Sequence, residues 1–298
     1  MKGILLMAYG SPSSLDQISD YFTSIRRGRR PAKQEIEELA KRYMDIGGIS
    51  PLNGITNRQI ESLRNLLKEN GSSTKVYVGM KHSKPFISET AEQISSDGIN
   101  ELLCIPLVPF YSVIGTDTYF NHVKETQMTQ KTSIHYVKSW NTEEGLIEYW
   151  AKSIEDAYKS IPGHSELLFT AHSLPITDLD NLETYKSQLN ETAELIASKL
   201  GIKSWSLSFQ SVGMSGGNWL GPTIYDHINL RLLSGAKNFV IAPIGFVSDN
   251  LETLYDAGIK CRDLIKDDGG RAVTASAPND SKMLIGCLYK IAERNGFL

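Results

Sequence analysis

The stretch ELLFTAHSLP, residues 166–175, carries an apolar run directly into a histidine, His172. Many histidines at strand ends are simply hydrogen-bonded there, so His172 predicts a reactive site only if it has a chemical partner. The stretch NFVIAPIGFVSDNLETLYD supplies a candidate, because Glu252 stands in the first turn of an expected helix behind another buried run. An imidazole and a carboxylate at such strand ends predict a base–acid pair or two ligands of a borderline divalent metal.

Two further residues have both a chemical and a structural interpretation. Glu252 stands three residues after Asp249, a spacing that would equally suit a capping box at the helix N-terminus. Tyr9 in MAYGSP ends a strand as His172 does, so it is either a core tyrosine or a second residue of the same site. Residue types alone leave both alternatives open.

A basic run, IRRGRRP, has Lys41, Arg42 and Tyr43 shortly after it. Its four arginines fall within five residues: Arg26, Arg27, Arg29 and Arg30. Charge runs are usually solvated faces or, in basic proteins, nucleic-acid patches. This chain has a net charge of −3, and guanidinium groups bind carboxylates bidentately. The run therefore favours a small polyanion as its ligand.

Short apolar runs alternate with helical patterns along the whole chain. Helical patterns such as IEELAKRYMDI and NRQIESLRNLLKEN separate them, which predicts parallel strands joined by crossover helices. Nearly continuous runs such as ELLCIPLV indicate strands that are covered on both faces. The fold class is therefore α/β. The expected strands are 3–9, 74–80, 101–108, 133–138, 166–171, 204–210, 237–244 and 271–276.

An internal repeat predicts two similar halves. GINELLCIPLV aligns with GAKNFVIAPIG at an offset of 137 residues, and LLMAYGSP aligns with LFTAHSLP at an offset of 163. We expect two Rossmann-like domains, 1–148 and 149–298, each with a four-stranded parallel sheet, and a ligand cleft between them. The last helix could pack back on the first domain. The unequal offsets indicate an insertion in the first half, the basic arm at about 22–51.

Composition excludes several classes of protein. A chain of 298 residues with a pI of about 6.1 has no global attraction to nucleic acid or anionic membranes. We expect no signal peptide, no membrane span and a cytoplasmic location, with the three scattered cysteines reduced. The stretch GMSGGN (213–218) matches no phosphate-binding template and predicts a flexible loop.

Several stretches in order resemble the ferrochelatase family over nearly the full length. They are MAYGSP, IRRGRRP, RYMDIGGISPL, GMKHSKPFI, AHSLP, WLGP and GFVSDNLETLYD. Tyrosine after alanine in MAYGSP resembles the monoderm bacterial branch, which inserts iron into coproporphyrin III. The resemblance implies two Rossmann-like domains around a porphyrin cleft, and a monomer or weak dimer, of which we expect the monomer.

The resemblance also implies roles for single residues. His172 and Glu252 would handle iron, and Tyr9 would be an axial ligand of the metallated product. His82 matches another histidine of the cleft. The residues that would line the porphyrin or bind its propionates are Tyr9, Ile25, Arg26, Arg42, Tyr43, Ser50 and Tyr119, with Arg27 as a reinforcing cation.

One departure from the family concerns an outer metal site. Lys260 stands where relatives carry an acidic residue, although Asp256 remains, so a magnesium or other divalent ion there is in doubt. Ferrous iron would be a substrate, and no prosthetic group is expected. His172 is expected to be neutral near pH 7, able to accept a proton or bind iron.

Other functions stay open at this stage. They are a protoporphyrin IX ferrochelatase, a sirohydrochlorin cobaltochelatase and a haem-binding chaperone. The cobaltochelatases usually carry a histidine where Glu252 stands, and a chaperone would show no turnover with iron. A periplasmic-type binding protein would need an export signal. The expected partners are coproporphyrin III, ferrous iron and, transiently, an enzyme of the haem pathway, with no nucleic acid and no membrane insertion.

Overall fold

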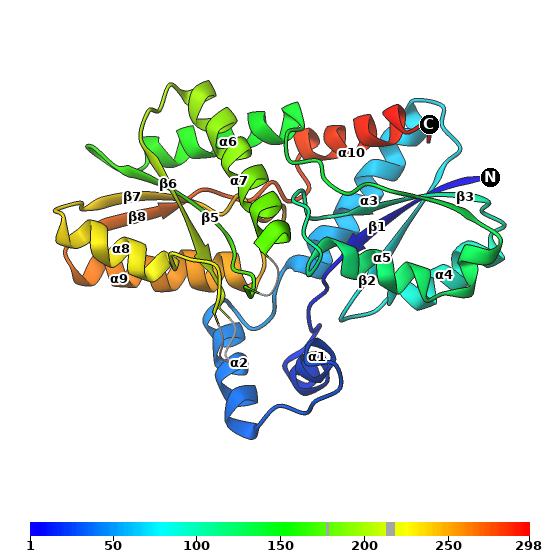
Figure 1. Ribbon diagram of the computed structural model, residues 1–298, viewed down its shortest axis with the longest axis horizontal. Helices are drawn as coiled ribbons and strands as arrows, with labels where there is room; N and C mark the ends of the chain where they lie inside the picture. Colours follow the sequence, from blue (N-terminus) through cyan, green and yellow to red (C-terminus); the bar gives the residue numbers. More distant parts are fainter. Residues whose placement is uncertain (177–178, 213–217) are drawn as a thin grey trace. The chain divides into compact units, whose positions relative to one another are not determined.

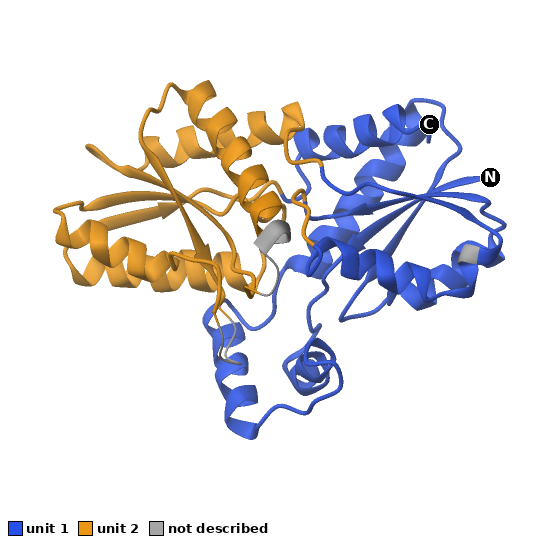
Figure 2. Cartoon of the chain, in the orientation of Figure 1, with its two compact units in different colours: residues 1–108, 113–139, 279–298 blue, residues 109–112, 140–278 orange. Residues whose placement is uncertain are grey.

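The computed structural model describes residues 1–176, 179–212 and 218–298 (Figure 1). GMSGGN therefore lies outside the described residues except for Asn218. The chain divides into two compact units (Figure 2). Unit 1 comprises Met1–Val108, Val113–Ser139 and Asn279–Leu298, and unit 2 comprises Pro109–Ser112 and Trp140–Pro278.

The boundary between the units differs from the expected one after residue 148. That position falls inside helix α6 (Glu144–Lys159), which belongs entirely to unit 2. The segment before α6 is already fixed in this unit, because Trp140 is buried and its N–H donates to the carbonyl of Pro109 at 2.9 Å. The last helix, α10 (Lys282–Arg294), belongs to unit 1, where it packs on α3 (Leu52–Glu69).

Unit 1 contains a four-stranded sheet in the order β2-β1-β3-β4, with every pair parallel. Its strands are β1 (Lys2–Ala8), β2 (Lys75–Met80), β3 (Glu101–Pro106) and β4 (Ser133–Tyr136). Besides α3 and α10, its helices are η1 (Leu15–Gln17), α1 (Ile18–Ile25), α2 (Lys33–Asp45), α4 (Ile87–Ser96), α5 (Thr116–Lys124) and η2 (Gln127–Gln130).

Unit 2 has the same sheet topology in the order β6-β5-β7-β8, again with parallel pairs. Its strands are β5 (Glu166–His172), β6 (Trp205–Gln210), β7 (Asn238–Ala242) and β8 (Arg271–Thr274). Besides α6, its helices are α7 (Leu179–Leu200), α8 (Ile224–Leu233), the π-helix η3 (Glu252–Lys260) and α9 (Cys261–Asp267). The predicted α/β fold with two four-stranded parallel sheets is confirmed.

Strand register confirms the internal repeat. In unit 1, Ile4 of β1 pairs with Leu103 of β3. Moving these positions along the chain by 163 and 137 residues leads to Leu167 and Val240, and the structure pairs these two residues in β5 and β7. The halves therefore share backbone hydrogen bonding as well as strand order.

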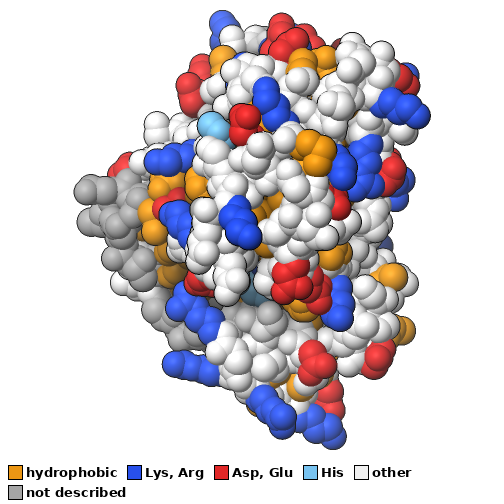
Figure 3. Space-filling model, turned by 90° about the vertical axis from the view of Figure 1, so that its right-hand side faces the viewer, with side chains coloured by type: hydrophobic (Ala, Val, Ile, Leu, Met, Phe, Trp, Pro, Cys, Tyr) orange, Lys and Arg blue, Asp and Glu red, His pale blue; other side chains and the backbone are white. Residues whose placement is uncertain are grey.

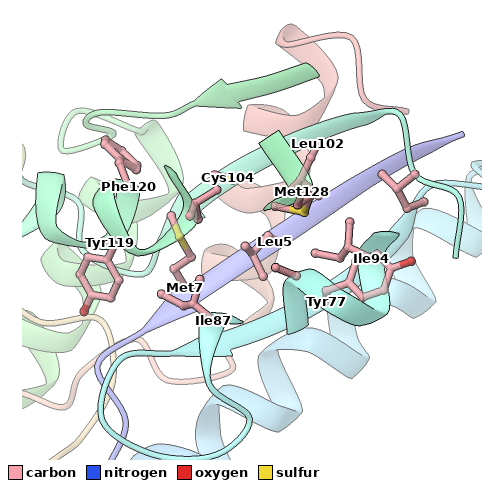
Figure 4. Packing of buried hydrophobic residues seen from close by; sticks show 13 residues of the cluster. Leu5, Met7, Tyr77, Ile87, Ile94, Leu102, Cys104, Tyr119, Phe120 and Met128 are labelled. Carbon is pink, nitrogen blue, oxygen red and sulfur yellow. The ribbon is translucent and has the colours of Figure 1, made fainter. Parts of the chain in front are cut away.

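The central strand of unit 1 is buried on both faces, as the continuous apolar pattern predicts. Ile4, Leu5, Leu6 and Met7 are all fully buried. Leu5 and Met7 point into one hydrophobic cluster beneath α4 and α5, where Tyr119 also lies (Figure 4). This packing fixes β1 and thereby the chain that leaves its carboxyl end.

The inserted arm forms two helices, α1 and α2, that project from the sheet of unit 1 (Figure 1). Helix α1 ends in a turn in which the N–H groups of Arg27 and Gly28 donate to the carbonyls of Ser24 and Thr23. Arg27 has a φ of 55°, in the left-handed region where glycine is favoured. The turn reverses the chain between the two helices of the arm.

No helix among the described residues is both long and apolar enough to cross a membrane. The three cysteines are buried free thiols. Their burial agrees with the expectation of reduced cysteines that take no part in a disulfide framework.

Candidate active site

His172 is the last residue of β5, and hydrogen bonds hold both its ring and its backbone. Its Nδ1 lies 2.5 Å from the carbonyl oxygen of Ser173. Since a carbonyl only accepts, Nδ1 carries a proton and donates it. Tyr185 on α7 donates its hydroxyl to the His172 carbonyl at 3.1 Å. The ring therefore presents Nε2 to the rest of the site.

Gly245 allows the chain after β7 to run close to the end of β5. Its N–H donates to the Thr170 carbonyl at 3.1 Å. A Cβ at this position would lie 2.7 Å from the Cα of Ala171, the residue before His172, and a strand backbone cannot move aside. The absence of a side chain at residue 245 therefore brings the segment that leads to Glu252 against β5.

Glu252 begins η3, but its side chain does not cap the helix. Asn250 does so, because its Oδ1 accepts from the N–H groups of Glu252 at 2.8 Å and Thr253 at 3.1 Å. Thr253 completes this arrangement by accepting from the Asn250 N–H at 2.9 Å. The alternative in which Asp249 and Glu252 form the capping box is wrong, and the Glu252 carboxylate is left available for another partner.

That partner is His172. Its Nε2 lies 3.3 Å from Glu252 Oε1, and the two side chains are 39% and 30% exposed. Gln210 at the end of β6 donates to the Glu252 carbonyl at 3.1 Å and thereby fixes the start of η3. The second carboxylate oxygen, Oε2, is buried and has no hydrogen-bond partner among the described residues. The pair thus offers an imidazole nitrogen and an oxygen with unused acceptor capacity.

The expectation that His172 is neutral at pH 7 is wrong for the unliganded pair. Burial by itself would lower the pKa of His172, but the charge of Glu252, its hydrogen bond and the Ser173 carbonyl together raise that pKa to about 9. The imidazolium form therefore dominates at neutral pH, with both ring nitrogens donating. When the proton on Nε2 leaves, its lone pair faces the carboxylate.

The imidazole and carboxylate donors suit a metal ion that is bound transiently better than one that is held permanently. Imidazole and carboxylate donors suit borderline divalent ions, and the unpartnered Oε2 has room for a cation as a partner. Within the described part of the chain, no three or more histidine, cysteine or acidic side chains cluster in a way that could hold a metal ion. Two protein ligands would hold an ion weakly enough to pass it on.

Asp256 lies one turn after Glu252 on η3 and is nearly buried. Its two oxygens accept from Ser211 at 3.0 Å and Tyr225 at 3.1 Å. Lys260 stands farther along the helix, with Nζ 4.6 Å from the centre of the Tyr225 ring. The residue that departs from the family pattern therefore packs on the tyrosine that binds Asp256.

In unit 1, Tyr9 and His82 lie together at the carboxyl ends of β1 and β2. The His82 N–H donates to the Tyr9 carbonyl at 3.0 Å, and the ring centres are 4.6 Å apart. Nδ1 of His82 lies 2.9 Å from the Ser24 hydroxyl of the arm. Burial, with the charges of Lys81 and His122, lowers the pKa of His82 to about 4, so the ring is neutral at pH 7.

A lysine that the sequence interpretation passed over lies between two of the predicted site residues. Nζ of Lys81 is 5.3 Å from the ring centre of Tyr9 and 4.8 Å from that of Tyr119, and it donates to Thr118 at 2.7 Å. Burial, followed by the charge of Arg27, lowers the pKa of Lys81 to about 8. Unit 1 therefore presents a cationic and aromatic environment.

The remaining predicted residues lie on or beside the arm. Arg26 binds Glu35 through both terminal nitrogens, a contact that residue types alone did not suggest. Ile25 ends α1 and Arg42 lies on α2, both partly exposed. Tyr43 is buried on α2, and Ser50 accepts from the Leu52 N–H at 3.2 Å at the start of α3. Ser50 thus has a structural contact besides its predicted ligand role.

Side chains of both charges are interspersed on the face shown in Figure 3. Lysine and arginine side chains there alternate with aspartate and glutamate, and hydrophobic atoms lie between them. Nucleic-acid-binding surfaces usually carry an extended basic patch. This face offers no such patch among the residues that the structure describes, in line with the net charge of −3.

Comparison with protein families identifies one that matches nearly the whole chain. The family described as ferrochelatase matches residues 1–296. A coproporphyrin III ferrochelatase of Oceanobacillus iheyensis is 37% identical over 284 residues, covering 93% of this chain and 91% of that protein. A protein of the same name from Geobacillus sp. (strain WCH70) is 36% identical over 297 residues, covering 97% and 96%.

A solved structure shows the same fold at low sequence identity. The sirohydrochlorin chelatase SirB from Bacillus subtilis subspecies spizizenii, in complex with cobalt, aligns with a TM-score of 0.57 at 12% identity. The alignment covers 99% of this chain and 98% of that one. At such identity the likeness concerns the fold alone.

Proposed function

Because the chain belongs to the ferrochelatase family, we propose that it is a lyase that inserts ferrous iron into coproporphyrin III in haem biosynthesis. The observation that carries this proposal is the pair of His172 and Glu252. Insertion consumes Fe²⁺ and a metal-free porphyrin and releases two pyrrole protons. The reaction therefore needs a group that binds iron and a group that accepts protons, and this pair can do both.

Iron and the Nε2 proton compete for the same lone pair of His172. In the free protein this proton lies between the imidazole and Glu252. Arriving iron displaces it to water and is then held by Nε2 and the Glu252 carboxylate, whose Oε2 gains a partner. Once iron moves to the porphyrin, Nε2 is free again and accepts one of the two pyrrole protons; the second leaves to water.

The porphyrin is bound by the residues that unit 1 gathers. Tyr9 is 39% exposed and supplies its hydroxyl oxygen as an axial ligand to the iron of the product. His82 packs against Tyr9, with the two rings tilted, and keeps its ring in place. Tyr119 and Lys81 form the floor beneath Tyr9. Cations of the arm, Arg26 and Arg27 foremost, bind propionates, and Ile25, Arg42, Tyr43 and Ser50 complete the binding surface.

The proposal also covers cofactors and setting. Iron is a substrate, and no prosthetic group takes part. The chain acts as a monomer in the cytoplasm, where reduced cysteines such as Cys104 persist. Coproheme, the product, passes to a further haem-pathway enzyme through a transient contact.

The test is anaerobic insertion of Fe²⁺ into coproporphyrin III and protoporphyrin IX, measured by absorbance under the same conditions. We expect turnover with coproporphyrin III and much slower turnover with protoporphyrin IX. Equal rates would overturn the assigned porphyrin, and binding without turnover would point to a haem-binding chaperone. A preference for cobalt and sirohydrochlorin would replace the proposal with the cobaltochelatase alternative.

A further inference from the structure

Arg26 is the arginine of the basic run whose side chain has an internal carboxylate partner. Nη1 donates to Glu35 Oε2 and Nη2 to Oε1, both at 2.7 Å. The side chains are 30% and 22% exposed. No ion pair is formed by Arg27, Arg29 or Arg30 within the described residues, and all three are exposed. The pair occupies the end of the guanidinium fork that would bind a substrate carboxylate.

We propose that Glu35 occupies the carboxylate-binding end of Arg26 in the free protein, so that a porphyrin propionate binds there only by displacing it. This inference rests on the proposed function, because it assigns the displacing group to coproporphyrin III. It adds a residue, Glu35, that sets the affinity for substrate and product.

The contacts of Glu35 keep the free-energy cost of losing Arg26 to a propionate low. Its Oε2 also accepts from the Ala32 N–H at 2.7 Å, a bond that holds the start of α2 and remains when Arg26 leaves. Among the described residues, Oε1 accepts only from Arg26, and the partly exposed carboxylate can take water in its place. Displacement therefore breaks the contact with Arg26 without opening the helix.

The geometry also keeps Arg26 in position during the exchange. The guanidinium carbon lies 5.1 Å from the ring centre of Phe22, one turn earlier on α1. This contact orients the guanidinium plane independently of Glu35. A propionate thus meets a fork that is already oriented, while Glu35, tied to Ala32, stays close enough to recapture Arg26 when the product leaves.

The test compares Glu35→Gln with Glu37→Gln for binding of metal-free coproporphyrin III, followed by fluorescence. Glutamine at residue 35 keeps an acceptor for Ala32 but loses the charge. Glu37 is a matched control, because it lies on the same helix and pairs with Lys33 at 3.5 Å. We expect Glu35→Gln to tighten binding by about threefold to tenfold, the scale of a partly exposed ion pair, and Glu37→Gln to change it less than about twofold.

Three further measurements separate a competitor from a simple structural contact. In an Arg26→Ala background, the effect of Glu35→Gln should vanish, because nothing remains to be released. The tetramethyl ester of coproporphyrin III, which has no carboxylates, should bind Glu35→Gln and wild type alike. In steady state, Glu35→Gln should lower KM without raising kcat, because glutamine recaptures Arg26 less readily and so competes less with substrate and displaces product more slowly.

Each other outcome has a defined meaning. Unchanged or weaker coproporphyrin III binding by Glu35→Gln overturns the inference, and faster tryptic cleavage at Arg27 or Arg29 would then show that the pair is a structural tie. An effect that persists in Arg26→Ala also overturns it. Tighter binding without iron insertion leaves the inference standing and refutes the proposed function. Iron insertion by the wild type, with no effect of Glu35→Gln on coproporphyrin III binding, refutes the inference and leaves the proposed function standing.

Discussion

Glu252→Gln tests the electrostatic coupling on which the proposed iron-binding step depends. With a pKa of about 9, only about 1% of His172 is neutral at pH 7 in the wild type. Glutamine removes the negative charge and weakens the hydrogen bond, while the burial that lowers the pKa remains. We expect the pKa of His172 to fall to about 6.5 or below, so that more than about half of it is neutral at pH 7.

The same shift sets how stability depends on pH. The folded-state pKa of His172 lies above its ordinary value of 6.5, so the pair stabilises the fold fully below pH 6.5 and loses this effect as pH rises through 9. If the pair were fully shielded from solvent, the pKa shift would contribute about 3 kcal/mol to the free energy of unfolding. The two side chains are 39% and 30% exposed, and screening by water reduces this contribution to about 1 kcal/mol. Glu252→Gln should abolish this pH dependence.

The assay is an NMR titration of the His172 ring in both proteins, together with urea unfolding at pH 6 and pH 10. Zn²⁺ binding gives an independent reading: below pH 9, wild-type affinity should rise about tenfold per pH unit, whereas the variant should level off near pH 7. Iron insertion should still collapse in the variant, because a ligand oxygen is lost. A wild-type midpoint near 6.5, or one that Glu252→Gln leaves unmoved, would refute the reasoning.

Three further outcomes are expected. His172→Ala should slow iron insertion by about 10² or more while porphyrin fluorescence quenching persists, and retained turnover would exclude its role. Arg26→Ala should weaken use of coproporphyrin III more than that of protoporphyrin IX by about tenfold, as should high salt, and equal losses would show that Arg26 only supports the arm. Asn250→Ala should destabilise the protein by about 1 kcal/mol and slow iron insertion, because the start of η3 loses its cap. Urea unfolding and the insertion assay measure these two effects. Unchanged insertion would show that other contacts hold Glu252.

Sequence patterns predicted the strands well because a doubly covered parallel strand is a nearly continuous apolar run. The expected runs 101–108 and 237–244 overshoot β3 and β7 only at their ends: β3 ends at the paired residue Pro106, and Pro243 follows Ala242, the last paired residue of β7. His172 was recognisable for the same reason, since it stands where such a run stops. What the pattern could not indicate is the protonation of His172, which depends on a contact 80 positions along the chain.

Contacts that depend on backbone geometry could not be predicted from the amino-acid sequence. The turn at Arg27 and Gly28 decides that Arg26 meets Glu35, and nothing in IRRGRRPAKQE marks that pairing. The helix η3 is a π-helix, and the side chain that caps its start is Asn250, one residue after the expected Asp249. Gln210 was detectable in principle, because it too ends a buried strand.

The repeat accounts for the similar positions of the predicted site residues at the carboxyl ends of β1 and β5. Ala8 pairs with Met80 in unit 1, and Ala171 pairs with Phe209 in unit 2. In both units a predicted site residue follows this pair: Tyr9 corresponds to His172. The hydrogen bond that follows is also repeated, since the N–H of Met80 donates to the carbonyl of Pro85 and that of Phe209 to the carbonyl of Pro222.

Equivalent positions on this shared backbone carry different side chains. Lys81 stands where unit 2 has Gln210, and His82 where it has Ser211. The unit 1 residues hold a cation and a neutral imidazole against Tyr9, a setting for an anionic aromatic ligand. Gln210 instead fixes the Glu252 backbone, and Ser211 binds the neighbouring carboxylate of η3. Since both units share strand order and register at these positions, the proposed difference in role, porphyrin binding in unit 1 and metallation in unit 2, rests on the side chains at the strand ends. Exchanging one of them should therefore alter binding or metallation without altering the fold.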